Sequence, residues 1–257
     1  MNTDAYIPYT QIVNRLPISQ GDILYICSDI LGIAKTCRDH GESFDCAKFI
    51  KTLQEAVGET GTLMFPTFNW DFCKGIPYNY TQTRGKTGSL GNAALTMPGF
   101  KRTLHPLYSF AVWGKDQDYL VQQNPVSAFG NDTPFAYMLE KQAKAFSIGI
   151  SPLQGNTFIH YIEQSIGVPY RYHKPFTADY IDEAGNVFEK SCTMYVRDLE
   201  LNLKYVLQPM EHIINQLNIN KSYIINTIPY HFTDLCGLYQ VVKLDILYNQ
   251  SRNMCQY

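Results

Sequence analysis

The architecture of the chain depends on Gly21-Asp-Ile-Leu-Tyr-Ile-Cys27 and, later, Gly61-Thr-Leu-Met-Phe-Pro-Thr67. Each is a short apolar run bounded by turn-forming residues, which is typical of a buried strand. Between them, apolar residues recur at helical spacing from Phe44 to Val57, and Gly58 ends the pattern. Strand, helix and strand in this order predict a βαβ unit with parallel strands.

Further elements follow this unit. Thr133-Pro134 predicts a helix start, because threonine can cap a helix and proline suits its first position. Residues 145–150 form an apolar run of strand length, and Gly155-Asn156 opens another helix. Beyond them, residues 176–181 and 187–196 flank a turn and predict an antiparallel hairpin.

Composition supports a folded protein. The chain has 257 residues, of which 45% are hydrophobic and 17% charged, which supplies a sizeable core. We predict a single α/β domain over residues 1–257. Its central sheet is expected to be mixed and largely parallel, flanked by helices, with a C-terminal antiparallel hairpin layer.

Charge, hydropathy and cysteine content argue against several classes of protein. A net charge of -2 lacks the basic excess of a nucleic-acid binder. No stretch is apolar enough to span a membrane, and the N-terminus does not resemble a signal peptide. The seven cysteines are odd in number and none are paired as C-x-x-C, so neither a metal site nor a disulfide framework is indicated. We expect reduced thiols in a cytoplasmic protein.

Residues 68–99 are long and irregular, which is usual for a functional segment. Asp71, Tyr78 and Tyr80 lie within it, and aromatic rings beside a carboxylate suit an amino-sugar through stacking and a charged hydrogen bond. We therefore predict these three as substrate-binding residues. The alternative is a solvated loop whose aromatic residues cover the edge of the core.

A second candidate segment is the turn Ser28-Asp29-Ile30-Leu31-Gly32, which follows the first strand. Backbone N–H groups after a strand can face a phosphate group. An ordinary strand-to-helix turn is the alternative interpretation.

Candidate catalytic groups lie on the helix after Asn156. Its apolar stripe is formed by Phe158, Ile159, Ile162 and Ile166. His160 and Glu163 are three residues apart and fall outside that stripe, so they can pair. A carboxylate beside an imidazole fixes its tautomer, as in a general-base pair. A structural, hydrogen-bonded histidine is the alternative.

His105-Pro106 and Ser109 form another candidate group. The proline places His105 in an extended conformation before the strand that carries Ser109. Ser109 could act as a nucleophile, as an oxyanion donor or as a hydroxyl bonded to the backbone. The absence of a G-x-S-x-G motif disfavours an acyl-serine hydrolase.

Taken in order, these motifs resemble the aminoglycoside 3-N-acetyltransferase family, antibiotic acetyltransferases whose fold is not the GNAT fold. The resemblance covers residues 18–176 and rests on Gly21-Asp22, Ser28-Asp29-Ile30-Leu31-Gly32, Val57-Gly58, Gly61-Thr62-Leu63-Met64-Phe65-Pro66-Thr67, Thr87-Gly88-Ser89-Leu90, Arg102, His105-Pro106, Ser109, Gly114, Phe129-Gly130, Pro134, Asn156-Thr157, His160, Glu163 and Pro169-Tyr170-Arg171-Tyr172. The chain departs from the family at Asp29, where a second serine is usual, and in lacking arginine in that turn. Residues 177–257 diverge from the family pattern.

The resemblance implies direct transfer of an acetyl group from acetyl-CoA, as co-substrate, to an amine of a small-molecule amino-sugar. It implies that His160 and Glu163 are the catalytic pair. The coenzyme site would be lined by Ser28, Asp29, Ile30, Leu31, Thr87 and Gly88. Ser109 and His105 would lie near the thioester, as coenzyme-binding and catalytic residues respectively.

Several alternatives stay open at this point. The acceptor is an aminoglycoside antibiotic or an amino-sugar of a polysaccharide pathway, and a homodimer is compatible with the sequence. A serine hydrolase using Ser109 with His105 or His160 is a second function. A non-catalytic sugar-binding or scaffold protein with the same fold is a third, because fold alone does not fix function.

Overall fold

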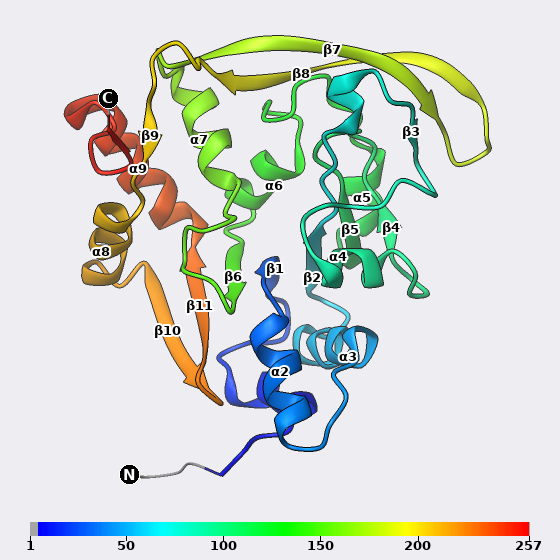
Figure 1. Cartoon of the computed structure of the whole chain (residues 1–257), viewed down its shortest axis with the longest axis vertical. Helices are drawn as coiled ribbons and strands as arrows, with labels where there is room; N and C mark the ends of the chain where they lie inside the picture. Colours follow the sequence, from blue (N-terminus) through cyan, green and yellow to red (C-terminus); the bar gives the residue numbers. More distant parts are fainter. Residues whose placement is uncertain (1–4, 257) are drawn as a thin grey trace.

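The computed structural model describes residues 5–256, and a seven-stranded sheet forms the centre of that part of the chain (Figure 1). Its strands, in spatial order, are β10 (Asn220–Ile225), β11 (Ile228–Asp234), β6 (Lys144–Ile148), β1 (Ile23–Ser28), β2 (Thr62–Pro66), β5 (Phe110–Gly114) and β4 (Lys101–Arg102). The two runs that anchored the sequence analysis are therefore the neighbouring strands β1 and β2 at the middle of the sheet.

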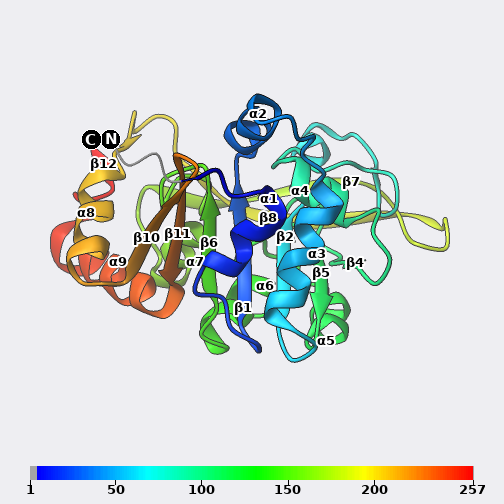
Figure 2. The same cartoon turned by 90° about the horizontal axis from the view of Figure 1, so that it is seen from below.

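The side chains of β1 show why helices cover both faces of this sheet. Leu24 and Ile26 point to one face and Tyr25 and Cys27 to the other, and each pair belongs to a different buried cluster. The first face is covered by α1 (Tyr9–Ile12), η1 (Val13–Arg15), α2 (Leu31–Asp39), α3 (Cys46–Val57) and α4 (Ser89–Ala94). Figure 2 shows α1 and α3 lying over β1 and β2.

The second face carries the helices that build the site. They are α5 (Gln117–Gln122), α6 (Pro134–Glu140), α7 (Phe158–Ile166), α8 (Gln208–Gln216) and α9 (Leu235–Asn249). The start predicted for α6 is confirmed, because the Thr133 side chain accepts a hydrogen bond from the Ala136 backbone and Pro134 follows it. The helix after Asn156 is also confirmed, as α7.

The predicted βαβ unit is confirmed. β1 and β2 are parallel, and α3 connects them with Phe49, Ile50 and Leu53 fully buried against the sheet. The α3 cap is Asp45, whose carboxylate accepts a hydrogen bond from the Lys48 backbone at 3.0 Å. The mixed sheet flanked by helices is thus observed as expected.

Parallel pairing is less extensive than predicted. Within this sheet of the described chain, β1 pairs in parallel with β2 and β6, and the other four neighbouring strand pairs are antiparallel. The tight turn at Asn226 and Thr227, both with positive φ, joins β10 to β11, and a turn this short can only connect antiparallel strands. The C-terminal part therefore also extends the central sheet.

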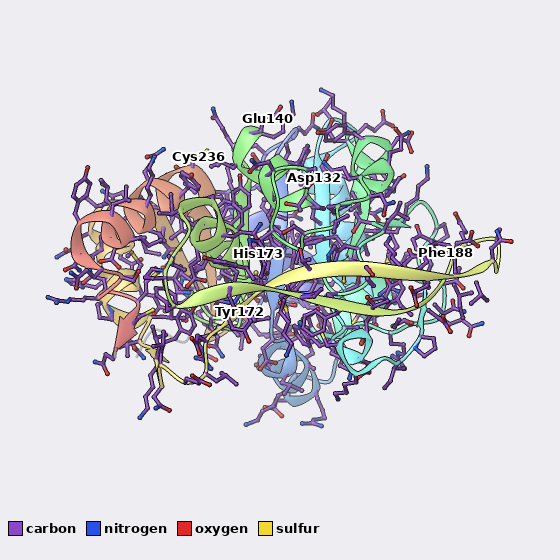
Figure 3. All side chains as sticks on the ribbon, turned by 90° about the horizontal axis from the view of Figure 1, so that it is seen from above. Asp132, Glu140, Tyr172, His173, Phe188 and Cys236 are labelled. Atoms are coloured by element: carbon purple, nitrogen blue, oxygen red, sulfur yellow. The ribbon has the colours of Figure 1, made fainter. Side chains whose placement is uncertain are left out.

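The predicted hairpin is confirmed and is longer than expected. β7 (Arg171–Ile181) and β8 (Val187–Arg197) pair antiparallel, and β3 (Tyr78–Asn79) joins β7 in a second sheet. The hairpin crosses one side of the molecule, with Tyr172 and His173 at its base and Phe188 near its turn (Figure 3). Because β7 begins at Arg171, that residue is held close to α7.

Three further features complete the description. η2 (Asp71–Lys74) lies within the long irregular segment, and β9 (Lys204–Tyr205) pairs with β12 (Cys255–Gln256) near the C-terminus. Residues 5–256 contain no helix that is both long and apolar enough to cross a membrane. The seven cysteines, all within the described part, are free thiols.

Candidate active site

The N-terminal end of α7 is fixed by the central sheet. The Tyr25 hydroxyl of β1 donates to the Gly155 carbonyl at 3.4 Å and accepts from the Thr157 backbone at 3.3 Å. The parallel strands β1 and β6 end at the same edge, where α/β proteins usually bind their ligands. The first turn of α7 is therefore held beside that edge.

The helix buries the predicted stripe and presents His160 at a pocket. Phe158, Ile159 and Ile162 are buried, whereas the His160 side chain is 31% exposed. His160 lines a pocket of about 220 Å³. Glu163 differs from the sequence-based expectation, because its side chain is completely buried beneath the histidine and is not on an exposed helix face.

His160 and Glu163 are in direct contact. Nδ1 of His160 lies 2.8 Å from Oε2 of Glu163. The Glu163 carboxylate can only accept, which favours a hydrogen on Nδ1, whereas Nη2 of Arg171, 3.0 Å from the same nitrogen, can only donate, which favours a bare Nδ1. With the hydrogen on Nδ1, Nε2 is the nitrogen without a proton. This is the tautomer that a general base requires, because Nε2 can then accept a proton.

Both Glu163 oxygens are fully engaged. Oε2 also pairs with Arg171 Nε at 2.8 Å, while Oε1 accepts from Tyr205 at 2.5 Å and Tyr170 at 3.0 Å. Burial alone raises the pKa of Glu163, but the hydrogen bond and charge of His160, the charge of Arg171 and the Tyr205 hydroxyl outweigh it. The net pKa lies below the ordinary value, so Glu163 stays an anion.

The sequence analysis assigned no role to Arg171, Tyr170 or Tyr205. The aromatic and basic run at residues 170–174 was a signal for the first two, but nothing in its spacing connects it with α7. Tyr205 lies in the segment predicted to diverge, and the pairing of Tyr205 with Cys255 holds it in place. Only the folded chain brings these groups to Glu163.

The residues predicted to bind the coenzyme form one group around two turns. An added Cβ at Gly88 would lie 3.5 Å from the Ser28 carbonyl oxygen, so the turn after β1 adjoins the turn before α4. The Asp29 carboxylate accepts a hydrogen bond from the Leu31 backbone N–H at 2.9 Å. Leu31 is the first residue of α2, and its side chain is exposed. Thr87 donates to the Pro66 carbonyl and accepts from the Phe68 backbone. The structure thus places Ser28, Asp29, Ile30, Leu31, Thr87 and Gly88 at one edge of the sheet.

Ser109 does not belong to this group, contrary to the prediction. Its side chain is buried, and Oγ lies 2.9 Å from Thr67 Oγ1 and 3.0 Å from Arg102 Nε. The buried Tyr78 hydroxyl donates to the same oxygen at 3.3 Å. No histidine is among these partners, so the hydrogen bonds of Ser109 do not support an activated nucleophile, and its coenzyme role stays a prediction.

His105 is held by contacts that do not suit the catalytic role predicted for it. It is buried, and its Nδ1 accepts from the backbones of Leu107 and Tyr108 at 3.2 Å each. Burial, with a smaller contribution from the charge of Lys190, lowers the pKa of His105 to about 3. A nitrogen already used by the backbone, in a ring that stays neutral, cannot serve as a base near pH 7.

This buried histidine predicts acid sensitivity. The unfolded chain protonates His105 below about pH 6.5, whereas the folded chain does so only near pH 3. Stability present above pH 6.5 is therefore lost as the pH falls, by about 1.4 kcal/mol per pH unit between those values. His105→Asn keeps a backbone acceptor and does not titrate. In urea unfolding at pH 7, 6 and 5, the free energy of unfolding of this variant is expected to fall less steeply with pH than that of the parent chain. Parallel pH profiles for the two proteins would contradict the lowered pKa of His105.

The residues predicted to bind substrate lie apart from His160. Asp71 forms ion pairs with Lys86 at 2.6 Å and Lys74 at 3.5 Å, and the Tyr80 hydroxyl donates to the Arg102 carbonyl at 2.6 Å. Asp71 and Tyr78 line one pocket and Tyr80 another, and neither shares a lining residue with the His160 pocket. Tyr78 is internal, so the structure does not unite these three residues at the site.

The described residues include no group of three or more His, Cys, Asp or Glu side chains able to hold a metal ion.

Comparison with known proteins identifies the family. The model of the aminoglycoside 3-N-acetyltransferase family matches residues 38–228. The chain belongs to the aminoglycoside 3-N-acetyltransferase family. The match extends beyond residue 176, where the resemblance quoted from the sequence ended, and so also includes Tyr205 of the site.

Curated relatives cover only part of the chain. The aminoglycoside N(3')-acetyltransferase-like protein YokD of Bacillus subtilis is 26% identical over 145 residues, which are 48% of this chain and 52% of that protein. Aminoglycoside N(3)-acetyltransferase VII of Streptomyces paromomycinus is 27% identical over 157 residues, 51% of this chain and 53% of that one. The chain thus aligns with about half the length of these relatives.

Solved structures share the whole fold. AAC-IIIb in a binary complex with CoASH has a TM-score of 0.76 at 16% identity, covering 94% of this chain and 95% of that one. The crystal structure of Bacillus subtilis YokD has the same TM-score at 19% identity, covering 95% and 94%. The non-GNAT acetyltransferase fold expected from the resemblance is therefore confirmed.

Proposed function

We propose that this chain is an acetyl-CoA-dependent N-acetyltransferase that acts on an amine of an amino-sugar, with His160 as general base and Glu163 as the residue that orients it. The observation that carries this proposal is the 2.8 Å contact between His160 Nδ1 and a buried, ionised Glu163. That contact leaves Nε2 as a proton acceptor on the partly exposed imidazole.

The reaction follows from this arrangement. Acetyl-CoA, when bound, supplies the acetyl group as a thioester. His160 takes a proton from the acceptor amine, so that the nitrogen lone pair can form the new C–N bond. As that bond forms, the C–S bond breaks and its electron pair leaves with sulfur, to which protonated His160 gives the first proton. The second proton, which nitrogen loses as it becomes an amide, passes to water. The Glu163 carboxylate stabilises the transient imidazolium.

The coenzyme would be held by the two turns at the sheet edge. Ser28, Asp29 and Ile30 precede the nine-residue helix α2, which begins at Leu31 and whose N-terminal end suits phosphate oxygens, and Thr87 and Gly88 adjoin this turn. The name of AAC-IIIb in complex with CoASH supports this coenzyme class for a protein of the same fold.

The acceptor is an amino-sugar, either an aminoglycoside or an amino-sugar of a polysaccharide pathway. The names of the curated relatives favour aminoglycosides and hence a role in antibiotic resistance. Polycationic acceptors benefit from acidic walls. Asp71 is neutralised by two lysines, and Glu163 is already paired with Arg171, so neither carboxylate adds free negative charge. A cytoplasmic location and a homodimer stay predictions.

The proposal is tested by measuring acetyl-CoA consumption with aminoglycosides, nucleotide-linked amino-sugars and simple amines, with mass detection of the product. We expect compounds of one of these three acceptor classes to gain a single acetyl group on nitrogen. Binding of acetyl-CoA without transfer to any amine would contradict the enzymatic proposal and support a silent sugar-binding protein. Absence of acetyl-CoA binding would remove the coenzyme assignment as well.

A further inference from the structure

Asn156 is a buried amide without side-chain partners. The residue is 4% exposed, and neither Oδ1 nor Nδ2 has a hydrogen-bond partner among the described residues. Its backbone is satisfied, because the amide donates to the Leu153 carbonyl at 3.1 Å and the carbonyl accepts from Ile159 at 3.3 Å. The chain therefore fixes the position of this residue and leaves its side chain unpaired.

Other buried asparagines of the same chain are paired. Asn69 is 6% exposed, and its side chain accepts from the Asp71 backbone and donates to the Arg84 carbonyl, both at 2.8 Å. Leaving a buried amide unpaired costs about 1–3 kcal/mol. A fold that pairs Asn69 but not Asn156 indicates that the partner of Asn156 comes from outside the chain.

The position of Asn156 identifies where that partner lies. Asn156 lines the pocket of about 220 Å³ together with His160 and Thr157, at the N-terminal end of α7. The apolar residues Leu153, Ile159 and Leu207 form much of the remaining wall. A pocket with largely apolar walls and a few convergent polar groups suits a mostly apolar segment that carries a polar group.

We propose that Asn156 binds a secondary amide of the pantetheine arm of the coenzyme, donating from Nδ2 to its carbonyl and accepting its N–H at Oδ1. This inference rests on the proposed function. Both atoms of Asn156 are unpaired, so the missing partner should offer a donor and an acceptor together. A phosphate only accepts and an ammonium only donates, whereas a secondary amide between methylene groups does both and matches the apolar walls.

The test compares Asn156→Leu with Asn69→Leu. Because Asn156 is unpaired in the ligand-free chain, an apolar residue of similar shape should leave the melting temperature unchanged or raise it. Asn69→Leu breaks two hydrogen bonds and should lower it. Calorimetric titration with free coenzyme A and with pantetheine should show Kd values for Asn156→Leu weaker by roughly 10- to 100-fold for both. Adenosine 3',5'-bisphosphate, which lacks the arm, should bind as to the parent chain.

Several outcomes would overturn the assignment. One is an unchanged Kd for coenzyme A and pantetheine; another is a loss of stability in Asn156→Leu equal to that in Asn69→Leu. A lower kcat with unchanged Kd would place Asn156 at the acetyl oxygen instead. If Asn156→Leu does not fold, Asn156→Asp, which keeps the shape and removes the donor, should still weaken both Kd values. If the parent chain itself does not bind coenzyme A, the proposed function fails first.

Discussion

Replacing His160 with alanine is expected to lower kcat by roughly 10²- to 10⁴-fold, the range that general bases contribute. The physical reason is that the amine nucleophile is protonated near neutral pH, and His160 is the pocket-lining base that Glu163 orients. Coenzyme affinity should change little, because the variant removes no group assigned to phosphate or pantetheine binding. Steady-state acetyl transfer and calorimetric binding of coenzyme A measure the two quantities separately.

His212→Ala is the matched control for this experiment. His212 is an exposed histidine on α8 and has no place in the proposed site, so its removal should leave kcat within about twofold on the rule for surface substitutions. Unchanged turnover in His160→Ala would remove the general-base assignment. Equal losses in both histidine variants would point to a fault in folding.

Replacing Arg171 with methionine is expected to destabilise the protein by about 3–5 kcal/mol, the usual cost of leaving a buried charge without its partner. The Glu163 side chain is completely buried and that of Arg171 is 7% exposed, so water cannot replace the guanidinium. Lys101→Met is the control, because Lys101 and Asp118 are an exposed pair with 52% and 74% exposure. The free energy of unfolding of Lys101→Met, measured in urea, should fall by at most about 1 kcal/mol.

The pH dependence gives Arg171→Met a second readout. In the parent chain the folded pKa of Glu163 lies below its ordinary value, so this group adds stability above about pH 4.5 that is lost as the pH falls through the folded pKa. Without Arg171 the carboxylate pKa rises, so the deficit of the variant should be largest near pH 7 and shrink below pH 4.5. A deficit independent of pH would show that Arg171 acts through packing and not through the charge of Glu163.

The sequence predicted the site unevenly. The spacing of His160 and Glu163 on one helix was sufficient to pair them, because helix geometry brings residues three apart together. It could not show that Glu163 is buried, because the groups that bury it, Arg171 and Tyr205, come from β7 and β9. The roles predicted for His105 and Ser109 rest on residue type, whereas their burial and hydrogen-bond partners favour structural roles.

Local patterns determined the βαβ unit, α6, α7 and the hairpin, since periodicity and capping depend on neighbours along the chain. Contacts between distant segments decided the remainder. The antiparallel strands β10 and β11 extend the sheet, and β9, from the same C-terminal part, brings Tyr205 to Glu163. The unpaired amide of Asn156 likewise exists only in the fold, because burial and hydrogen bonding depend on which distant groups surround a side chain. The sequence by itself therefore determined these elements and the pairing of His160 with Glu163, and tertiary packing decided which polar side chains are paired within the fold and which are not.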